Sequence, residues 1–253
     1  MNEINTREKK LKKAAFFFFL AFALLSLIHI VLCTAEGFEA EKESLWTARA
    51  CTKVFLIPLL TLFCIFYMAS LSFSKKERIL LSTAFLLHTA GDIFMLWPEK
   101  EIFFMAGLAS FLAGHVFILI LIWKHSFKSV KIWVWALYIA LYAVFITFML
   151  RYFNLDNLVM NIAIPIYGFI LLTVAFAGLG QMIGKVSPYS AFIFAGGLTF
   201  MFSDMMIAIN NFIYKNTMPF HDLIIMFTYI TGDFMIAWGS INTLQSLKAV
   251  KSE

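Results

Sequence analysis

Eight long apolar stretches, separated by short polar segments, run along almost the whole chain. Each is close to the roughly 20 residues that a helix needs to cross the hydrocarbon core of a bilayer. Because lipid offers no partner for free backbone groups, each is predicted to be a helix. The pattern predicts an all-α membrane protein with eight transmembrane helices. The stretches are Ala14–Cys33, Ala50–Phe73, Arg78–Trp97, Glu101–Trp123, Val130–Leu150, Leu158–Ile183, Tyr189–Tyr214 and Asp222–Gln245.

These stretches also divide the chain. We expect residues 1–13 to form a basic cytoplasmic segment, 14–246 a single eight-helix transmembrane domain and 247–253 a cytoplasmic tail. The basic start resembles a signal peptide, but no small-residue cleavage site cleanly follows the first stretch, which favours a retained helix. Seven helices are an alternative if the fifth or sixth stretch is re-entrant, although that would place later basic loops outside.

The Lys and Arg residues are unevenly placed around the stretches. With the N-terminus inside, 14 of the 20 fall in cytoplasmic segments and 5 in outer segments, while Lys53 falls within a helix. Basic residues prefer the cytoplasmic side, so both termini are predicted to be cytoplasmic. The cytoplasmic residues are Arg7, Lys9, Lys10, Lys12, Lys13, Lys75, Lys76, Arg78, Lys124, Lys128, Lys131, Lys185, Lys248 and Lys251; the outer ones are Lys42, Arg49, Lys100, Arg151 and Lys215.

Composition points the same way. Hydrophobic residues make up 62% of the chain and charged residues only 14%, whereas about a quarter of a soluble domain is charged. The net charge of +5 does not indicate nucleic acid, because the cations flank apolar segments. From the compact chain and short loops we expect an integral protein of a bacterial cytoplasmic membrane. A homodimer stays an open alternative.

Motifs of soluble enzymes and cofactor sites are absent. The sequence contains no Walker loop, no Gly-x-Gly-x-x-Gly, no Gly-x-Ser-x-Gly and no His-Glu-x-x-His, so no cofactor and no metal are predicted. Cys33, Cys51 and Cys64 show neither metal-ligand spacing nor a disulfide framework, although Cys33 and Cys51 both fall near the outer face, where they could pair.

Ionisable groups within the stretches are few. Burying a charge in lipid costs at least about 2.5–3.5 kcal/mol, so such groups face the bundle interior and indicate a functional site. We expect them to converge on one polar cavity. The alternative is a packing network, with the aspartates paired to Lys53 or a histidine, or hydrogen-bonded to Ser203 and Asn210. The groups are Lys53, His88, Asp92, His115, Asp204 and Asp233.

Two segments carry a family resemblance. Ala90–Phe117, AGDIFMLWPEKEIFFMAGLASFLAGHVF, contains Asp92, Gly107, Phe111 and His115 in the register of a signature of the YhhN family of lysoplasmalogenases. Ser190–Asn210, SAFIFAGGLTFMFSDMMIAIN, is similar to a second signature helix and supplies Ser203 and Asp204.

Two further positions match only in part. Lys53 occupies the place of the lysine in the family's Lys-Pro-Leu, but here the proline, Pro58, comes later. Asp233 stands in the last helix where family members often carry Gln or His, so it is a departure from the pattern. The resemblance runs from about Lys53 to the final helix.

The resemblance implies an eight-helix membrane hydrolase. Such enzymes cleave the vinyl ether of a lysoplasmalogen, lysoplasmenylethanolamine or lysoplasmenylcholine, to a fatty aldehyde and glycerophosphoethanolamine or glycerophosphocholine. The lysophospholipid in the bilayer would be the partner of the protein.

Vinyl ether hydrolysis needs one protonated carboxylic acid and one ionised carboxylate. Our hypothesis assigns these roles to Asp92 and Asp204, without deciding which is which, and makes His115 a proton relay or water-orienting group. Lys53 would hold the lipid phosphate. His88, Ser203, Asn210 and Asp233 complete the predicted substrate-binding set.

Other function classes stay open. A metal-dependent intramembrane lipid hydrolase would use His88, His115 and Asp92 as zinc ligands. A proton-coupled transporter would use the aspartates as proton carriers. A binding or sensor protein would keep the lipid cavity without catalysis.

Overall fold

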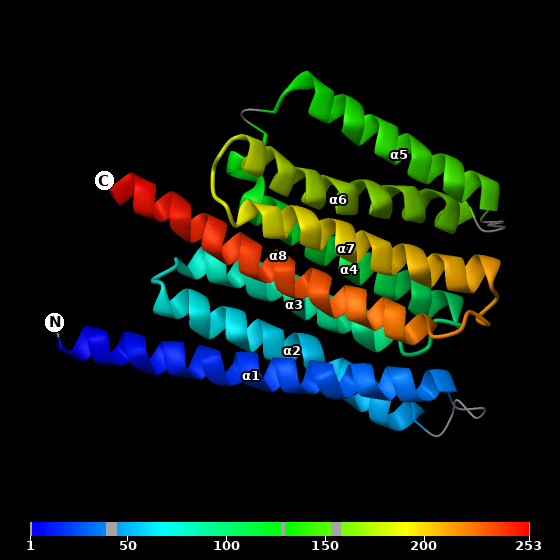
Figure 1. The fold of residues 1–253 in the computed structure, drawn as a ribbon, viewed down its shortest axis with the longest axis horizontal. Helices are drawn as coiled ribbons and strands as arrows, with labels where there is room; N and C mark the ends of the chain where they lie inside the picture. The colour runs from blue at the N-terminus through cyan, green and yellow to red at the C-terminus, as the bar shows by residue number, and fades with distance from the viewer. Residues whose placement is uncertain (1, 39–44, 128–129, 153–157, 253) are drawn as a thin grey trace. The chain divides into compact units, whose positions relative to one another are not determined.

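The computed structural model describes residues 2–38, 45–127, 130–152 and 158–252. These residues form eight long helices and no strand (Figure 1). A 3-10 turn, Trp123–His125, follows α4, and a π-helical segment, Ile209–Ile213, follows α7. The helices are α1 (Asn2–Phe38), α2 (Trp46–Ser70), α3 (Lys75–Phe94), α4 (Glu101–Ile122), α5 (Ile132–Tyr152), α6 (Leu158–Ile183), α7 (Ser190–Ala208) and α8 (His221–Ser252).

Seven of the eight helices in the described residues are long and apolar enough to cross a membrane. The exception is α3, whose 20 residues include the charged run Lys75–Arg78 at one end and Asp92 near the other. The prediction of an all-α membrane protein is confirmed. Which side of the membrane each terminus occupies stays a prediction, and two cations used for it, Lys42 and Lys128, lie outside the described residues.

Two helices extend well past the apolar stretches that predicted them. Helix α1 takes in most of the basic segment 1–13, and α8 continues beyond Gln245 to Ser252. Lysine and glutamate are good helix formers, and an exposed pair of Glu8 and Lys12, 2.6 Å apart at i,i+4 spacing, adds a few tenths of a kcal/mol. The polar flanks therefore continue the helices instead of forming separate segments.

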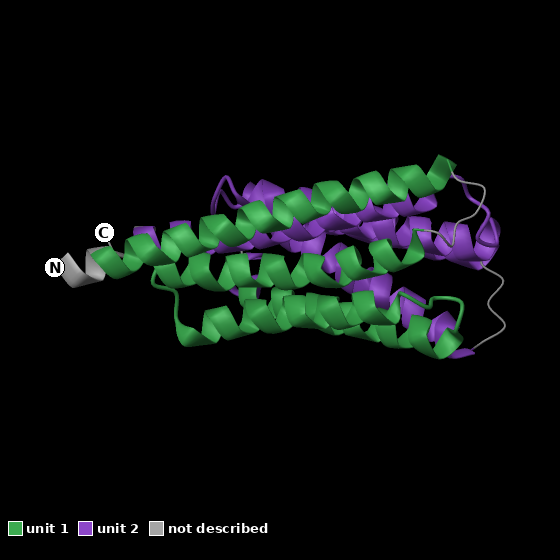
Figure 2. Ribbon diagram, turned by 90° about the horizontal axis from the view of Figure 1, so that it is seen from below, with its two compact units in different colours: residues 1–121 green, residues 122–253 purple. Residues whose placement is uncertain are grey.

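The chain divides into two compact units (Figure 2). The first ends at Leu121 and holds α1 to α4, with α1 packed along α2 and α2 along α3. Helix α3 begins with a capping box in which Ser74 and Glu77 each bond the other's backbone nitrogen. Cys33, Cys51 and Cys64 are all free thiols. The single domain expected over residues 14–246 stays a prediction.

The second unit begins at Ile122, and α6, α7 and α8 pack in chain order within it. Glycines let α7 approach both neighbours closely. A Cβ added at Gly197 would lie 2.9 Å from the Cα of Ala175 on α6, and one at Gly196 would lie 2.9 Å from the carbonyl oxygen of Gly232 on α8. These separations are too short for any side chain, so the small residues of α7 permit the packing, as is common between membrane helices.

Candidate active site

In the first unit, helices α3 and α4 meet through three small residues. A Cβ at Gly91 would lie 2.7 Å from the Phe111 ring, and one at Gly107 would lie 2.8 Å from Met95. A Cβ at Gly114 would lie 2.8 Å from the carbonyl oxygen of Ala84 and would also collide with the His88 ring. Because the helices run antiparallel, these contacts follow one another along a single seam. Much of the segment Ala90–Phe117 therefore encodes close helix packing.

Two histidines lie on this seam. The rings of His88 and His115 stack with centroids 4.6 Å apart, and the edges of Phe85 and Phe111 close around His88. Both histidines are fully buried. Nδ1 of His115 lies 2.9 Å from the carbonyl oxygen of Phe111. A carbonyl only accepts, so Nδ1 carries the hydrogen and Nε2 is the nitrogen with a free lone pair in the neutral ring; the catalytic role of His115 stays a prediction.

Asp92 lies on α3 one turn beyond His88 and is buried. It directly follows Gly91, whose lack of a side chain admits the Phe111 ring at this level of the seam. The expectation that His88 and Asp92 project to the same side of one helix agrees with the burial of both. Asp92 belongs to the first unit and Asp204 to the second, and their pairing stays a prediction.

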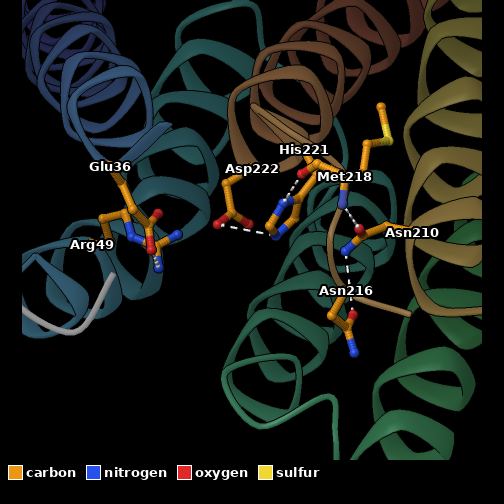
Figure 3. Close-up of polar contacts among 7 residues, drawn as sticks. All are labelled: Glu36, Arg49, Asn210, Asn216, Met218, His221 and Asp222. Atoms are coloured by element: carbon orange, nitrogen blue, oxygen red, sulfur yellow. Dashed lines mark hydrogen bonds and ion pairs between the residues drawn. The ribbon is translucent and has the colours of Figure 1, made fainter. Parts of the chain in front are cut away.

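Lys53 lies near the start of α2, within the first unit. Its side chain is partly exposed and makes no hydrogen bond or ion pair to any described residue. One turn earlier, Arg49 forms a 2.6 Å ion pair with Glu36 of α1 (Figure 3). A neighbouring residue, Thr52, bonds Nδ1 of His29 at 2.7 Å. The end of the α1–α2 pair is therefore cross-linked by polar groups, and the binding of an anion by Lys53 stays a prediction.

In the second unit, the hydroxyl of Tyr167 on α6 donates a hydrogen bond to Oδ2 of Asp204 on α7. Tyr167 is only 5% exposed. Asp233, fully buried on α8, lies close enough to interact electrostatically with the Tyr167 hydroxyl. The structure thus gathers two of the predicted aspartates around one phenol, with each of the three groups supplied by a different helix.

Two other predicted residues make structural bonds in this unit. The Ser203 hydroxyl donates to the carbonyl oxygen of Ile225 on α8 at 2.8 Å, and so ties α7 to α8 beside Asp204. The Asn210 side chain lies in the π-helical segment and bonds Asn216 and the backbone nitrogen of Met218 (Figure 3). It thereby holds the turn that leads into α8. Their predicted contacts with substrate stay predictions.

Tyr167 was not among the residues singled out from the sequence. It is one of 8 tyrosines in an aromatic-rich chain, and it sits inside an apolar stretch without a charged neighbour. No local spacing marks it, because its partner lies 37 residues further along. Only the pairing of α6 with α7 reveals its role.

The described residues contain no group of three or more His, Cys, Asp or Glu side chains that could hold a metal ion. The second unit offers the fully buried Asp233 carboxyl and the partly buried Asp204 carboxyl near a phenol, and the first unit offers a buried carboxyl with two imidazoles. Such groups can donate and accept protons and can stabilise a positive charge.

Comparison with known proteins gives one result. The chain matches the model of the YhhN family over residues 48–240, whereas no curated protein and no solved structure matches it. The matched region covers more than half of the 253 residues and includes both Ala90–Phe117 and Ser190–Asn210, which confirms the family predicted from the sequence. The chain belongs to the YhhN family.

Proposed function

We propose that this protein is a membrane-embedded hydrolase that cleaves the vinyl ether bond of lysoplasmalogens. The observation that carries the proposal is the partly buried carboxylate of Asp204, to which Tyr167 of the neighbouring apolar helix donates a hydrogen bond. The chain is a member of the YhhN family. The substrate class comes from the resemblance of its sequence to the lysoplasmalogenases of that family.

The reaction requires a proton on carbon. An acid protonates the vinyl carbon farther from the ether oxygen, which leaves an oxocarbenium ion. Water then adds to the carbon attached to that oxygen and releases a proton. The resulting hemiacetal collapses to a fatty aldehyde and the glycerophospho-alcohol, so that one water is consumed in total.

Two carboxyl groups suit these steps, one protonated and one ionised. A buried environment stabilises the neutral form of a carboxyl group, whereas hydrogen bonds to the anion stabilise the charged form. In the proposed mechanism Asp92 and Asp204 form the pair, and His115 carries the proton through Nε2. Proton transfer by a positioned side chain contributes about 10²–10⁴-fold to the rate of such reactions.

The remaining residues bind the lipid. Lys53, partly exposed at the start of α2, would hold the substrate phosphate. His88, Ser203, Asn210 and Asp233 would complete the walls of the site. A site among membrane helices suits a substrate that is itself a single-chain lipid, because the alkenyl chain need not leave an apolar environment to reach the carboxyls.

Aldehyde release tests this proposal. Protein purified in detergent is given lysoplasmenylethanolamine, with acyl lysophosphatidylethanolamine as the control lipid. We expect aldehyde from the vinyl ether only, and a loss of about 10²-fold or more in Asp92→Asn and in Asp204→Asn.

Asp222→Asn is the matched control. This carboxyl lies in the first turn of α8, 3.4 Å from Nε2 of His221, and its replacement should leave the rate unchanged (Figure 3). Absence of aldehyde from folded wild-type protein with both the ethanolamine and the choline lipid would contradict the proposal.

A further inference from the structure

The α6–α7 seam brings Tyr167 to Asp204 by register. The backbones meet where a Cβ at Gly178 would lie 2.5 Å from the nitrogen of Phe194, and again where one at Gly197 would lie 2.9 Å from Ala175. Two turns further along these antiparallel helices, Tyr167 faces Asp204. Their hydrogen bond is therefore the continuation of a tightly packed seam and does not depend on a flexible side chain reaching across.

The backbone carrying Asp204 is also held from the other side. Its neighbour Ser203 bonds the carbonyl oxygen of Ile225 on α8 at 2.8 Å. One turn earlier, Phe200 packs against Tyr229 with ring centroids 5.4 Å apart, and a Cβ at Gly232 would lie 2.9 Å from the Phe200 nitrogen. Asp204 therefore has little freedom to turn away from the phenol.

The hydrogen bond from Tyr167 favours one protonation state of Asp204. A phenol donates a stronger hydrogen bond to a carboxylate than to a neutral carboxylic acid, because the acceptor is then charged. The bond favours the ionised form of Asp204, which lies partly buried among apolar helices where a charge is otherwise costly. Asp233 on α8 directly follows Gly232, which packs against the backbone of Phe200 one turn before Asp204.

We propose that Tyr167 is a positioning residue that keeps Asp204 ionised and fixes its orientation, which assigns Asp204 to stabilising the oxocarbenium ion and directing water. The assignment rests on the proposed vinyl ether hydrolysis. The proton delivered to carbon then comes from another carboxyl, which in the mechanism above is Asp92.

Infrared titration tests the charge of Asp204 without requiring turnover. Purified protein is titrated while the carbonyl band of protonated carboxyl groups is recorded, with Asp204→Asn subtracted to isolate the contribution of Asp204. In Tyr167→Phe we expect the midpoint of that contribution to move up by about one to two pH units, as the loss of a hydrogen bond to a charged group implies. The same midpoint in wild type and Tyr167→Phe would overturn the proposal.

A second, more conservative replacement at position 167 keeps the test possible if Tyr167→Phe does not fold. Incorporation of 3-fluorotyrosine at position 167 keeps the hydroxyl and nearly the same ring volume but makes the phenol a stronger donor. The midpoint should then move to lower pH, opposite to Tyr167→Phe. No movement in the fluorinated protein would contradict the role of Tyr167.

Tyr138→Phe is the matched control. Tyr138 lies on α5 in the same unit, and its hydroxyl bonds Thr173 at 2.9 Å and the carbonyl oxygen of Phe169 at 3.3 Å, not a carboxylate. Its replacement should leave the Asp204 midpoint unchanged. A midpoint shift in Tyr138→Phe equal to that in Tyr167→Phe would mean that Tyr167 acts only through packing.

Kinetics then connect the charge to the reaction. With vinyl ether substrate, Tyr167→Phe should move the rising limb of the kcat/KM–pH profile upward by the same amount as the infrared midpoint. If the infrared midpoint of Asp204 shifts in Tyr167→Phe but the wild-type protein releases no aldehyde, the positioning role stands and only the proposed function is contradicted. An unmoved pH profile in an active enzyme would overturn the assignment of Asp204.

Discussion

The two units of this chain both bury polar groups among apolar helices, but they hold them by different means. In the first, His88 and His115 stack on each other and are enclosed by phenylalanine rings, and Nδ1 of His115 bonds a carbonyl oxygen of its own helix. In the second, Tyr167 crosses from α6 to α7 to bond the Asp204 carboxylate. The first unit packs its histidines among aromatic rings, and the second joins a carboxylate to a phenol by a hydrogen bond between two helices.

The difference shows that ionisable residues within apolar stretches, which look alike in the sequence, have different surroundings in the two units. Ionisable residues in membrane helices indicate function, but their surroundings decide what they can do. The seam of α3 and α4 uses Gly91, Gly107 and Gly114 to admit a ring or a bulky side chain. The seam of α6 and α7 uses Gly178 and Gly197 to bring two backbones together, and so sets Tyr167 against Asp204.

The largest expected effect comes from overfilling the two seams. Gly197→Leu should destabilise the protein by about 3 kcal/mol or more, because the added side chain meets the backbone of Ala175, which cannot move aside. Gly91→Leu should cost about 1–2 kcal/mol, since it meets the ring of Phe111, which can shift. Thermal unfolding in detergent measures both, with Gly37→Leu at an exposed position of α1 as the control. Equal losses at the two seams would remove the distinction between them.

The next effect concerns the histidine stack. If His115 carries a proton, His115→Gln should lower kcat by about 10²-fold, while His88→Phe, which keeps an aromatic ring against His115, should leave kcat within a few-fold of wild type. Steady-state aldehyde release provides the measurement. Equal loss in the two variants would mean that the stack acts only as packing.

A smaller effect is expected for the lipid phosphate. Lys53→Met should raise KM about tenfold with kcat nearly unchanged, because it removes a binding interaction made equally in the ground and transition states. Lys53→Arg, which keeps the charge, should recover most of the affinity. A fall in kcat at unchanged KM would instead place Lys53 in the chemistry.

The smallest effect concerns the start of α3, the one long helix in the described residues that is not apolar enough to count as a membrane span. Ser74→Ala removes the capping box and should cost about 1 kcal/mol of stability. Tyr189 precedes α7 in the second unit and makes no side-chain cap to it, so Tyr189→Phe should cost almost nothing. Chemical denaturation of the two variants would show whether capping matters more for the less apolar helix, and an equal cost would argue that it does not.

The fold could be predicted because each helix must satisfy its own backbone within lipid. All eight apolar stretches became helices, and Pro165 did not break the stretch Leu158–Ile183. The ends were less predictable, since polar flanks extend α1 and α8. The π-helical segment at Ile209–Ile213 was also missed, because Tyr189–Tyr214 reads as one continuous apolar run.

The candidate site was predictable only in part. The aspartates could be found because a carboxyl in an apolar stretch is conspicuous, whereas a tyrosine there is common. Tyr167 acquires its meaning from the register of two antiparallel helices, which glycines such as Gly178 and Gly197 set through contacts that no local pattern encodes. The same holds for Ser203, whose partner on α8 is 22 residues away.

The central claim is that the protein adds a proton to the vinyl carbon of its substrate. Turnover of lysoplasmenylethanolamine in deuterium oxide, with immediate trapping of the aldehyde, tests it most directly, and authentic unlabelled aldehyde carried through the same steps corrects for exchange. We predict one deuterium on the carbon next to the aldehyde group, and loss of product in Asp204→Asn. Aldehyde without that deuterium, or with the same yield from Asp204→Asn, would contradict acid-catalysed hydrolysis at this site.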